Sequence, residues 1–171
     1  MEKPRIGFAR TVARKILKDC GIQKPPVDIR QIVSELGYTY IEVPTFPRNV
    51  GALFLEQNGE QYAAVNANHH SQQKRFSVAH EVGHIQMGHT LEYCDEPPSL
   101  DNPPTGKRHS EKERTFEREA NIFAGELLVP LEMLKVEFKR RQDIDALAEI
   151  FFVSAQVISI AIMDHQRSLY K

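Results

Sequence analysis

Residues 75–84 of the chain read Arg75-Phe76-Ser77-Val78-Ala79-His80-Glu81-Val82-Gly83-His84. The last five residues of this stretch form the pattern His-Glu-x-x-His. Four residues of α-helix turn through about 400°, so both histidines would lie on one helix face and could bind one metal ion. Glu81 would stand beside them, where it can act on water held by the metal. The pattern therefore predicts a zinc-dependent hydrolase.

The main alternative is an amphipathic helix whose two histidines are satisfied by ordinary hydrogen bonds. Apolar residues surround the motif at the spacing of a largely buried helix, namely Phe76, Val78, Ala79, Val82 and Ile85. Buried imidazole and carboxylate groups need polar or metal partners. The apolar surroundings therefore favour the metal site over the alternative.

A third ligand is needed, because a catalytic zinc ion commonly binds three protein side chains and a water. Residues 111–128 predict a helix whose apolar face contains Glu117, with Asn121 one turn further on, while Glu119 and Glu126 project to the other side. We therefore expect Glu117 to be the ligand and Asn121 to steady a ligand histidine or the carboxylate. The alternative for Glu117 is a surface salt bridge with a neighbouring arginine.

Other histidines fit the metal less well. His89 follows His84 by five residues, about 140° around a helix, so we expect it to point away from the metal as a helix-end residue. The longer pattern His-Glu-x-x-His-x-x-Gly-x-x-His fails, because Met87 and Thr90 hold its last two positions. The group that stabilises the oxyanion stays open among His69, His70, Tyr93 and His109.

Two stretches together closely resemble the ImmA/IrrE family of metallo-endopeptidases: residues 75–84, and Glu117-Arg118-Glu119-Ala120-Asn121-Ile122-Phe123-Ala124-Gly125-Glu126-Leu127-Leu128-Val129-Pro130. The resemblance covers residues 25–135 and, more loosely, the C-terminus. It implies zinc ligands at His80, His84 and Glu117 and a catalytic glutamate at Glu81. Family members typically carry Met where Val129 stands. The resemblance also implies a substrate class, helix-turn-helix repressors of mobile elements or stress-response genes.

The remaining sequence predicts an α+β fold, a compact zinc-peptidase domain with a small antiparallel sheet, two metal-binding helices and a helical C-terminal appendage. Helices are expected at 6–19, 28–36, 71–88, 111–128, 131–140, 144–150 and 155–163, strands at 38–43, 50–56 and 61–66, and a long loop at 92–110. We expect residues 1–130 to form the zinc metallopeptidase domain. Residues 131–171 would form the appendage, helix-turn-helix-like and packed on the same domain.

Composition narrows the function classes. A net charge of −1 in 171 residues argues against a dominant polyanion-binding role. The two cysteines, Cys20 and Cys94, lack metal-site or disulfide-framework spacing, and no apolar run has the length of a signal peptide or membrane span. We therefore expect a cytoplasmic protein with a protein substrate, without membrane contact and without nucleic acid as a direct partner.

The predicted function is a zinc-dependent endopeptidase that cuts a helix-turn-helix repressor and so relieves repression. Zinc would lower the pKa of a bound water to about 7, and Glu81 would pass its proton to the leaving amine. Two alternatives remain, a regulator that sequesters a repressor without cutting it and a DNA-binding regulator using residues 143–163. A sequestering protein would not need Glu81, and a DNA reader would want a more basic helix than this one, which has no Arg or Lys before Arg167.

Overall fold

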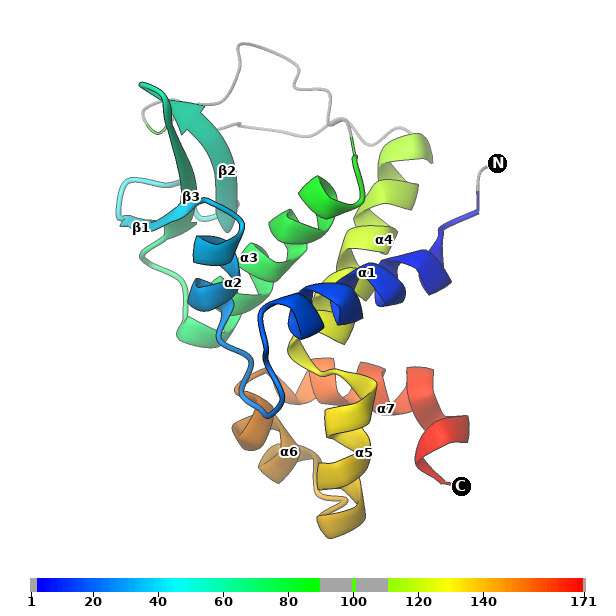
Figure 1. Ribbon diagram of the computed structural model, residues 1–171. Coiled ribbons are helices and arrows are strands. Elements are labelled where there is room, and N and C mark those ends of the chain that lie inside the picture. The colour runs from blue at the N-terminus through cyan, green and yellow to red at the C-terminus, as the bar shows by residue number, and fades with distance from the viewer. Residues whose placement is uncertain (1–2, 90–99, 101–110, 171) are drawn as a thin grey trace.

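The chain forms an α+β fold in the computed structural model, which describes residues 3–89, 100 and 111–170. Its elements follow in the order α1 (Ile6–Asp19), α2 (Ile29–Glu35), β1 (Thr39–Val43), β2 (Ala52–Gln57), β3 (Glu60–Asn66), α3 (Ser71–Gln86), α4 (Glu111–Leu128), α5 (Leu131–Arg140), α6 (Ile144–Phe151) and α7 (Ala155–Leu169). Figure 1 shows α3 between the sheet and α4, with α1 packed along α4 and helices α5–α7 gathered below. The predicted fold class is confirmed.

Three of the described helices, α2, α6 and α7, start at short polar side chains that accept backbone N–H groups. The carboxylate of Asp28 accepts from Arg30 and Gln31 at the start of α2, and Asp143 and Ser154 cap α6 and α7 in the same way. Ser71 is the first helical residue of α3, and the cap position before it is held by His70 without a side-chain bond.

The sheet is mixed, so the expectation of an antiparallel sheet is wrong for one strand pair. β2 and β3 form an antiparallel hairpin around Asn58 and Gly59, whose φ angles of 55° and 80° suit the tight turn that an Asn-Gly pair predicts. β1 pairs in parallel with the other edge of β3. The connection at residues 44–51 carries the chain across from one edge to the other, and this crossing makes β1 and β3 run in the same direction.

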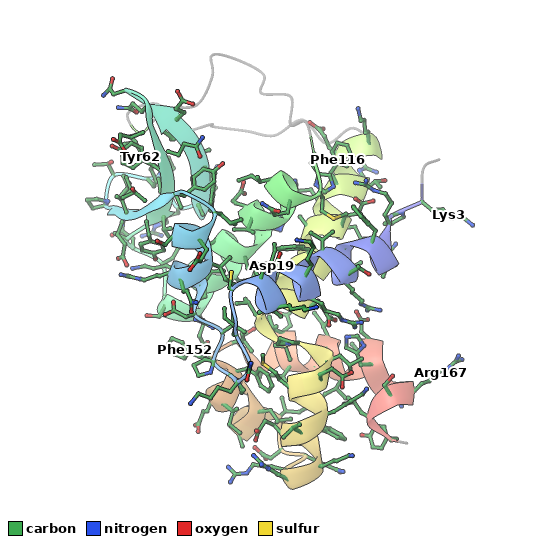
Figure 2. All side chains as sticks on the ribbon, viewed as in Figure 1. Lys3, Asp19, Tyr62, Phe116, Phe152 and Arg167 are labelled. Atoms are coloured by element: carbon green, nitrogen blue, oxygen red, sulfur yellow. The ribbon has the colours of Figure 1, made fainter. Side chains whose placement is uncertain are left out.

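The larger core lies where the helices meet one another and one face of the sheet. Side chains such as Val78 and Val82 of α3 and Phe123 and Leu127 of α4 are fully or almost fully buried there, and Figure 2 shows side chains filling the space between the ribbons. A smaller cluster covers the other face of the sheet, formed by Phe46, Val50, Leu53, Leu55 and Ala64. Apolar burial on both faces fixes the sheet against α3.

Helices α6 and α7 are bent by 104° relative to each other around Val153 and Ser154. Phe152 ends α6 with a φ of 52°, and the Arg75 guanidinium donates a hydrogen bond to its carbonyl oxygen over 3.1 Å. Since Arg75 belongs to α3, this bond ties the turn to the helix that carries the His-Glu-x-x-His motif.

The predicted long loop at 92–110 lies outside the described residues except for Leu100, as does Cys94. Within the described chain, no single helix has both the length and the apolar character to cross a bilayer. The bent pair α6 and α7 meets that test only when its two helices are counted together.

Candidate metal centre

Three side chains from two helices converge at one point. His80 and His84 come from α3, and Glu117 comes from α4. The two Nε2 atoms lie 3.0 Å apart, the Glu117 carboxylate oxygens lie 3.2 Å from His80 Nε2 and 3.4 Å from His84 Nε2, and no other group of three possible ligands occurs among the described residues. The structure therefore brings together the three residues that the sequence predicts as ligands.

The spacing of these atoms fits a zinc ion. Zinc bonds to nitrogen and oxygen measure about 2.0–2.1 Å, and tetrahedral angles then separate neighbouring ligand atoms by about 3.3 Å. The observed separations of 3.0–3.4 Å match this value. The His84 side chain is only 3% exposed, but that of Glu117 is 26% exposed. The cluster is therefore open to solvent on one side, which leaves room for a fourth ligand.

Gly83 lets the two helices approach closely enough to form the cluster. A Cβ atom at this position would lie 2.9 Å from the Phe123 ring and 3.2 Å from the Cα atom of Ala120. Contacts this short are not tolerated without a shift of the neighbouring atoms. The absence of a side chain at Gly83 thus sets the distance between His84, one residue later, and Glu117 on the facing helix.

Asn121 takes the supporting position predicted for it. Its side-chain oxygen lies 2.9 Å from His80 Nδ1, so it accepts the ring N–H there. A neutral imidazole carries one N–H, and the other nitrogen then keeps a free lone pair. His80 Nε2 therefore faces Glu117 and His84 as an unprotonated nitrogen.

The expectation that His89 points away from the cluster is wrong. Gly88 has a φ of 68°, which ends α3 and turns the next residue back toward the helix. The Nδ1 atoms of His89 and His84 lie 3.0 Å apart, and the His89 ring stacks on Phe116 with centroids 4.2 Å apart. Burial lowers the pKa of the His89 imidazole despite a hydrogen bond to Glu119. A calculation based on a continuing helix could not foresee the turn at Gly88.

Glu119 points away from the metal cluster as predicted, but it is buried rather than solvated, with 1% exposure. Arg5 donates to it through its backbone N–H and its guanidinium at 2.7–3.1 Å, and His89 Nε2 lies 2.9 Å away. Burial alone would raise the pKa of this carboxyl, but the hydrogen bonds from Arg5 and His89 outweigh it and lower the pKa to about 2.

Glu126 has matching surroundings two turns further along α4. It is also buried, and it binds Arg14 at 2.7 Å and His165 at 3.0 Å. Burial again opposes ionisation, and the bonds from His165 and Arg14 lower the pKa of the carboxyl. The amphipathic pattern of α4 did not predict that both glutamates are buried, because α1 and α7 cover a face of α4 whose own residues are polar. No pattern in the sequence pointed to Arg5 or Arg14 as their partners.

Glu81, the predicted catalytic glutamate, and the four oxyanion candidates are the remaining predicted site residues. Glu81 follows His80 in α3 and is half-buried beside the cluster. His69 has its Nε2 atom 2.9 Å from the carbonyl oxygen of Arg48, so its ring supports the loop before β2. His70 is exposed at the start of α3. Tyr93 and His109 lie outside the described residues.

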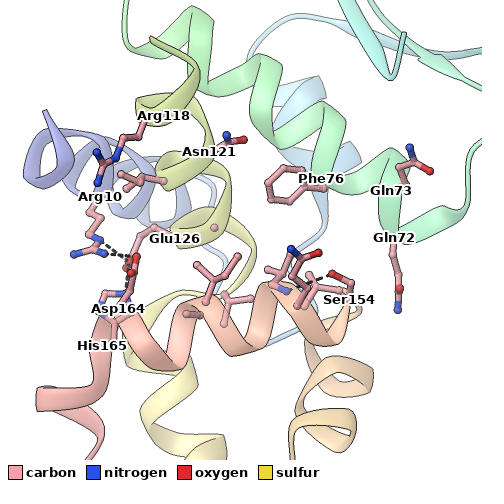
Figure 3. A pocket seen from close by; sticks show the side chains of 18 of the residues that line it. Arg10, Gln72, Gln73, Phe76, Arg118, Asn121, Glu126, Ser154, Asp164 and His165 are labelled. Carbon is pink, nitrogen blue, oxygen red and sulfur yellow. Dashed lines mark hydrogen bonds and ion pairs between the residues drawn. The ribbon is translucent and has the colours of Figure 1, made fainter. Parts of the chain in front are cut away.

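A cavity of about 650 Å³ lies between α3, α4 and α7 (Figure 3), and none of the three cluster residues lines it. Its apolar lining includes Phe76, Ile122, Val129, Val157 and Ile160. Gln72, Gln73 and Arg118 add polar groups to the lining. Asn121 also lines the cavity, so this space reaches the side chain that holds His80. Its size and its mostly apolar walls are those of a site for several apolar side chains or a small ligand.

The fold is similar to that of a protein of known structure. A solved structure described as a Mycobacterium tuberculosis transcriptional regulator is similar to this chain with a TM-score of 0.65 and 17% sequence identity. The similarity covers 88% of this chain but 45% of that one, so the chain spans less than half the length of the regulator. No curated protein sequence gives a significant match.

The sequence profile of the Peptidase_M78 family, described as the IrrE N-terminal-like domain, matches residues 45–163. This range contains both stretches on which the resemblance to ImmA/IrrE peptidases rests. It also contains all three residues of the cluster, and it covers more than half of the chain. The chain therefore belongs to the Peptidase_M78 family and is of the metallopeptidase type.

Proposed function

We propose that this chain is a zinc-dependent endopeptidase that makes a specific cut in a helix-turn-helix transcriptional repressor and so relieves repression. The observation that carries the proposal is the cluster of His80, His84 and Glu117, whose ligand atoms have the spacing of a zinc site and which lies open to solvent. Membership in a metallopeptidase family supports the same chemistry.

Each side chain has a separate task in this proposal. His80, His84 and Glu117 hold the zinc ion, which when bound supplies a Lewis acid that activates water and polarises the scissile carbonyl. Glu81 accepts the proton of the attacking water and delivers it to the leaving amine. Asn121 keeps the His80 ring turned so that its Nε2 lone pair faces the site.

Two features support the binding of an extended polypeptide. β2 is an edge strand that contacts α3, the helix of the motif, and an edge strand can pair with an extended peptide through backbone hydrogen bonds. The cavity lined by Asn121, the residue that holds His80, offers apolar walls for substrate side chains. We assign the first feature to the backbone of the substrate and the second to its side chains.

The substrate class rests on the resemblance to ImmA/IrrE peptidases, and the similarity in fold to a transcriptional regulator suits a regulatory setting. DNA binding through residues 143–163 has less support, because α7 has no Arg or Lys before Arg167 and one face of that helix is buried. We assign residues 131–171 to an appendage that supports the peptidase part, residues 1–130.

The deciding experiment is to incubate the zinc-loaded protein with the repressor encoded beside it and to identify fragments by mass spectrometry. We expect one cut, in a segment that can become extended, loss of cutting with a chelator, and little activity on casein. Many cuts in unrelated unfolded proteins would contradict the repressor-specific function but not the peptidase chemistry. A stable complex with intact repressor and bound zinc would instead favour sequestration.

A further inference from the structure

Two buried glutamates of α4 have nearly the same partners. Glu119 and Glu126 are seven residues apart and therefore lie on one helix face. Glu119 binds Arg5 and His89, and Glu126 binds Arg14 and His165. Arg10 adds a longer ion pair to Glu126 at 3.9 Å. Only the first of these two histidines touches the metal cluster. The difference suggests that the Glu119 group has a task that the Glu126 group lacks.

The contacts around Glu119 continue without a break to the cluster. The Arg5 guanidinium lies 2.7 Å from Glu119 Oε2 and also 3.3 Å from the carbonyl oxygen of Met87 at the end of α3. Glu119 Oε2 lies 2.9 Å from His89 Nε2, and His89 Nδ1 lies 3.0 Å from His84 Nδ1. Three side chains, those of Arg5, Glu119 and His89, thus connect the segment before α1 to the predicted zinc ligand His84. Figure 2 shows that segment, marked by Lys3, near the end of α4 that carries Phe116.

The order of donors and acceptors in this chain of contacts follows from Glu119. Arg5 only donates hydrogen bonds and a carboxylate only accepts them. His89 Nε2 has Glu119 as its nearest partner, with the Arg5 nitrogen further away at 3.4 Å, so Nε2 carries the N–H. The neutral ring then accepts at Nδ1, and His84 Nδ1 must be the donor. His84 Nε2 is left with a free lone pair toward His80 and Glu117.

We propose that Arg5, Glu119 and His89 are positioning residues for the metal centre, which fix the ring orientation and tautomer of His84 as Asn121 does for His80. The inference rests on the proposed zinc site. Partners of this kind typically raise metal affinity by 10- to 100-fold. The sequence predicts that Glu119 projects away from the metal, and the contact through His89 connects it to the cluster all the same.

The first test compares Glu119→Gln with Glu126→Gln by chelator competition for zinc. Both variants remove a buried charge held by an arginine and a histidine, so both lose thermal stability. We expect zinc affinity to fall about 10- to 100-fold in Glu119→Gln and to change less than about twofold in Glu126→Gln, which leaves His84 untouched. Equal affinities in the two variants, whether both unchanged or both lowered, would overturn the proposal.

A second pair of variants avoids buried positions. The Arg5 and Arg14 side chains are each 48% exposed and each binds one of the two glutamates. We expect Arg5→Ala to weaken zinc binding several-fold, Arg5→Lys to restore part of it, and Arg14→Ala to leave it unchanged. The absorption spectrum of the cobalt-substituted protein should shift in Arg5→Ala and not in Arg14→Ala. Identical spectra and affinities in the two alanine variants would contradict the positioning role.

The same measurements separate this inference from the proposed function. If the unaltered protein binds zinc and cuts the repressor while Glu119→Gln binds zinc equally well, only the positioning role is wrong. If the unaltered protein binds no zinc at all, both the metal centre and the positioning role are wrong.

Discussion

Glu81 and Glu117 lie on facing helices, and both are half-buried. Glu117 has one carboxylate oxygen within 3.2 Å of His80 Nε2 and the other within 3.4 Å of His84 Nε2, which is the position of a ligand. Glu81 follows His80 by one residue, about 100° around the helix. A side chain on that part of the helix can reach a water beside the cluster without joining the ligand set.

The first prediction at this scale is that Glu81→Gln binds about one zinc ion per chain and no longer cuts the repressor. The amide keeps the size of the carboxylate but cannot accept the proton of the attacking water. Metal content is measured by atomic absorption, with His80→Ala as the variant that loses zinc. If Glu81→Gln were as poor in zinc as His80→Ala, the division between base and ligands would be wrong.

The second prediction concerns acid stability of the metal-free protein. The pKa of Glu119 is about 2 in the fold and ordinarily 4.5, so the folded state favours the ionised form. The resulting stability is complete above about pH 5 and is lost as the pH falls toward 2. A difference of this size corresponds to about 3 kcal/mol of unfolding free energy.

Urea unfolding in EDTA between pH 3 and pH 7 measures this contribution. Glu119→Gln should be less stable than the unaltered protein at pH 7, and the two curves should converge toward pH 3. Glu126 and Glu42 also have lowered pKa values, so both proteins lose some folding stability in acid for this reason. The contribution of Glu119 is the difference between the two curves. Parallel curves across this pH range would show that the Glu119 carboxylate contributes no such term.

At the scale of helices and strands, the sequence predicted most of what has a local cause. Asp28 and Asp143 cap their helices through bonds within three residues, and the Asn58-Gly59 turn sets the hairpin. The parallel pairing of β1 with β3 depends on how residues 44–51 cross the sheet, for which the sequence carried no signal. For α4, the sequence placed Glu117 on the face that meets α3, as the structure has it. It gave no sign that the opposite face, with Glu119 and Glu126, is buried, because the pattern of one helix does not reveal that α1 packs there.

Gly83 gives a prediction for the contact between α3 and α4. Gly83→Ala places a methyl group 2.9 Å from the Phe123 ring, so we expect a loss of about 1–3 kcal/mol in unfolding free energy and weaker zinc binding as the helices separate. Gly125→Ala is the control, since nothing lies within 4 Å of its Cβ position, and it should be neutral or slightly stabilising. Equal effects in the two variants would mean that helix propensity alone was measured.

Gly125 lines the cavity between α3, α4 and α7, so a larger residue at this position tests the role of the cavity. Gly125→Leu directs a large side chain into open space that substrate side chains would fill, so we expect slower cutting of the repressor with unchanged zinc affinity. Steady-state kinetics should show the loss mainly as a higher KM. Unchanged kinetics would remove the cavity from the proposed substrate site.

For the molecule as a whole, the sheet, α3, α4 and α1 follow one another as layers, and the metal cluster lies between the two middle layers (Figure 1). The sequence predicted the contents of those middle layers because a metal site requires particular residue types at particular spacings. It did not predict that α1 supplies cations to the far face of α4. An ion pair between residues more than 100 positions apart, such as Arg5 and Glu119, produces no periodic pattern in the sequence from which it could be predicted.

Helix α1 lies outside residues 45–163, the range that defines the family match. Arg14 of α1 forms an ion pair with Glu126, and Arg5, the residue just before α1, forms one with Glu119. Both carboxylates are almost completely buried. A buried charge that loses its partner typically costs about 3–5 kcal/mol. A protein trimmed to the matched residues would also lose α2, β1 and His165, the histidine that binds Glu126, so it should fail to fold on its own, which circular dichroism would show as a loss of helix signal. We expect the unit that folds by itself to extend beyond the matched residues at both ends.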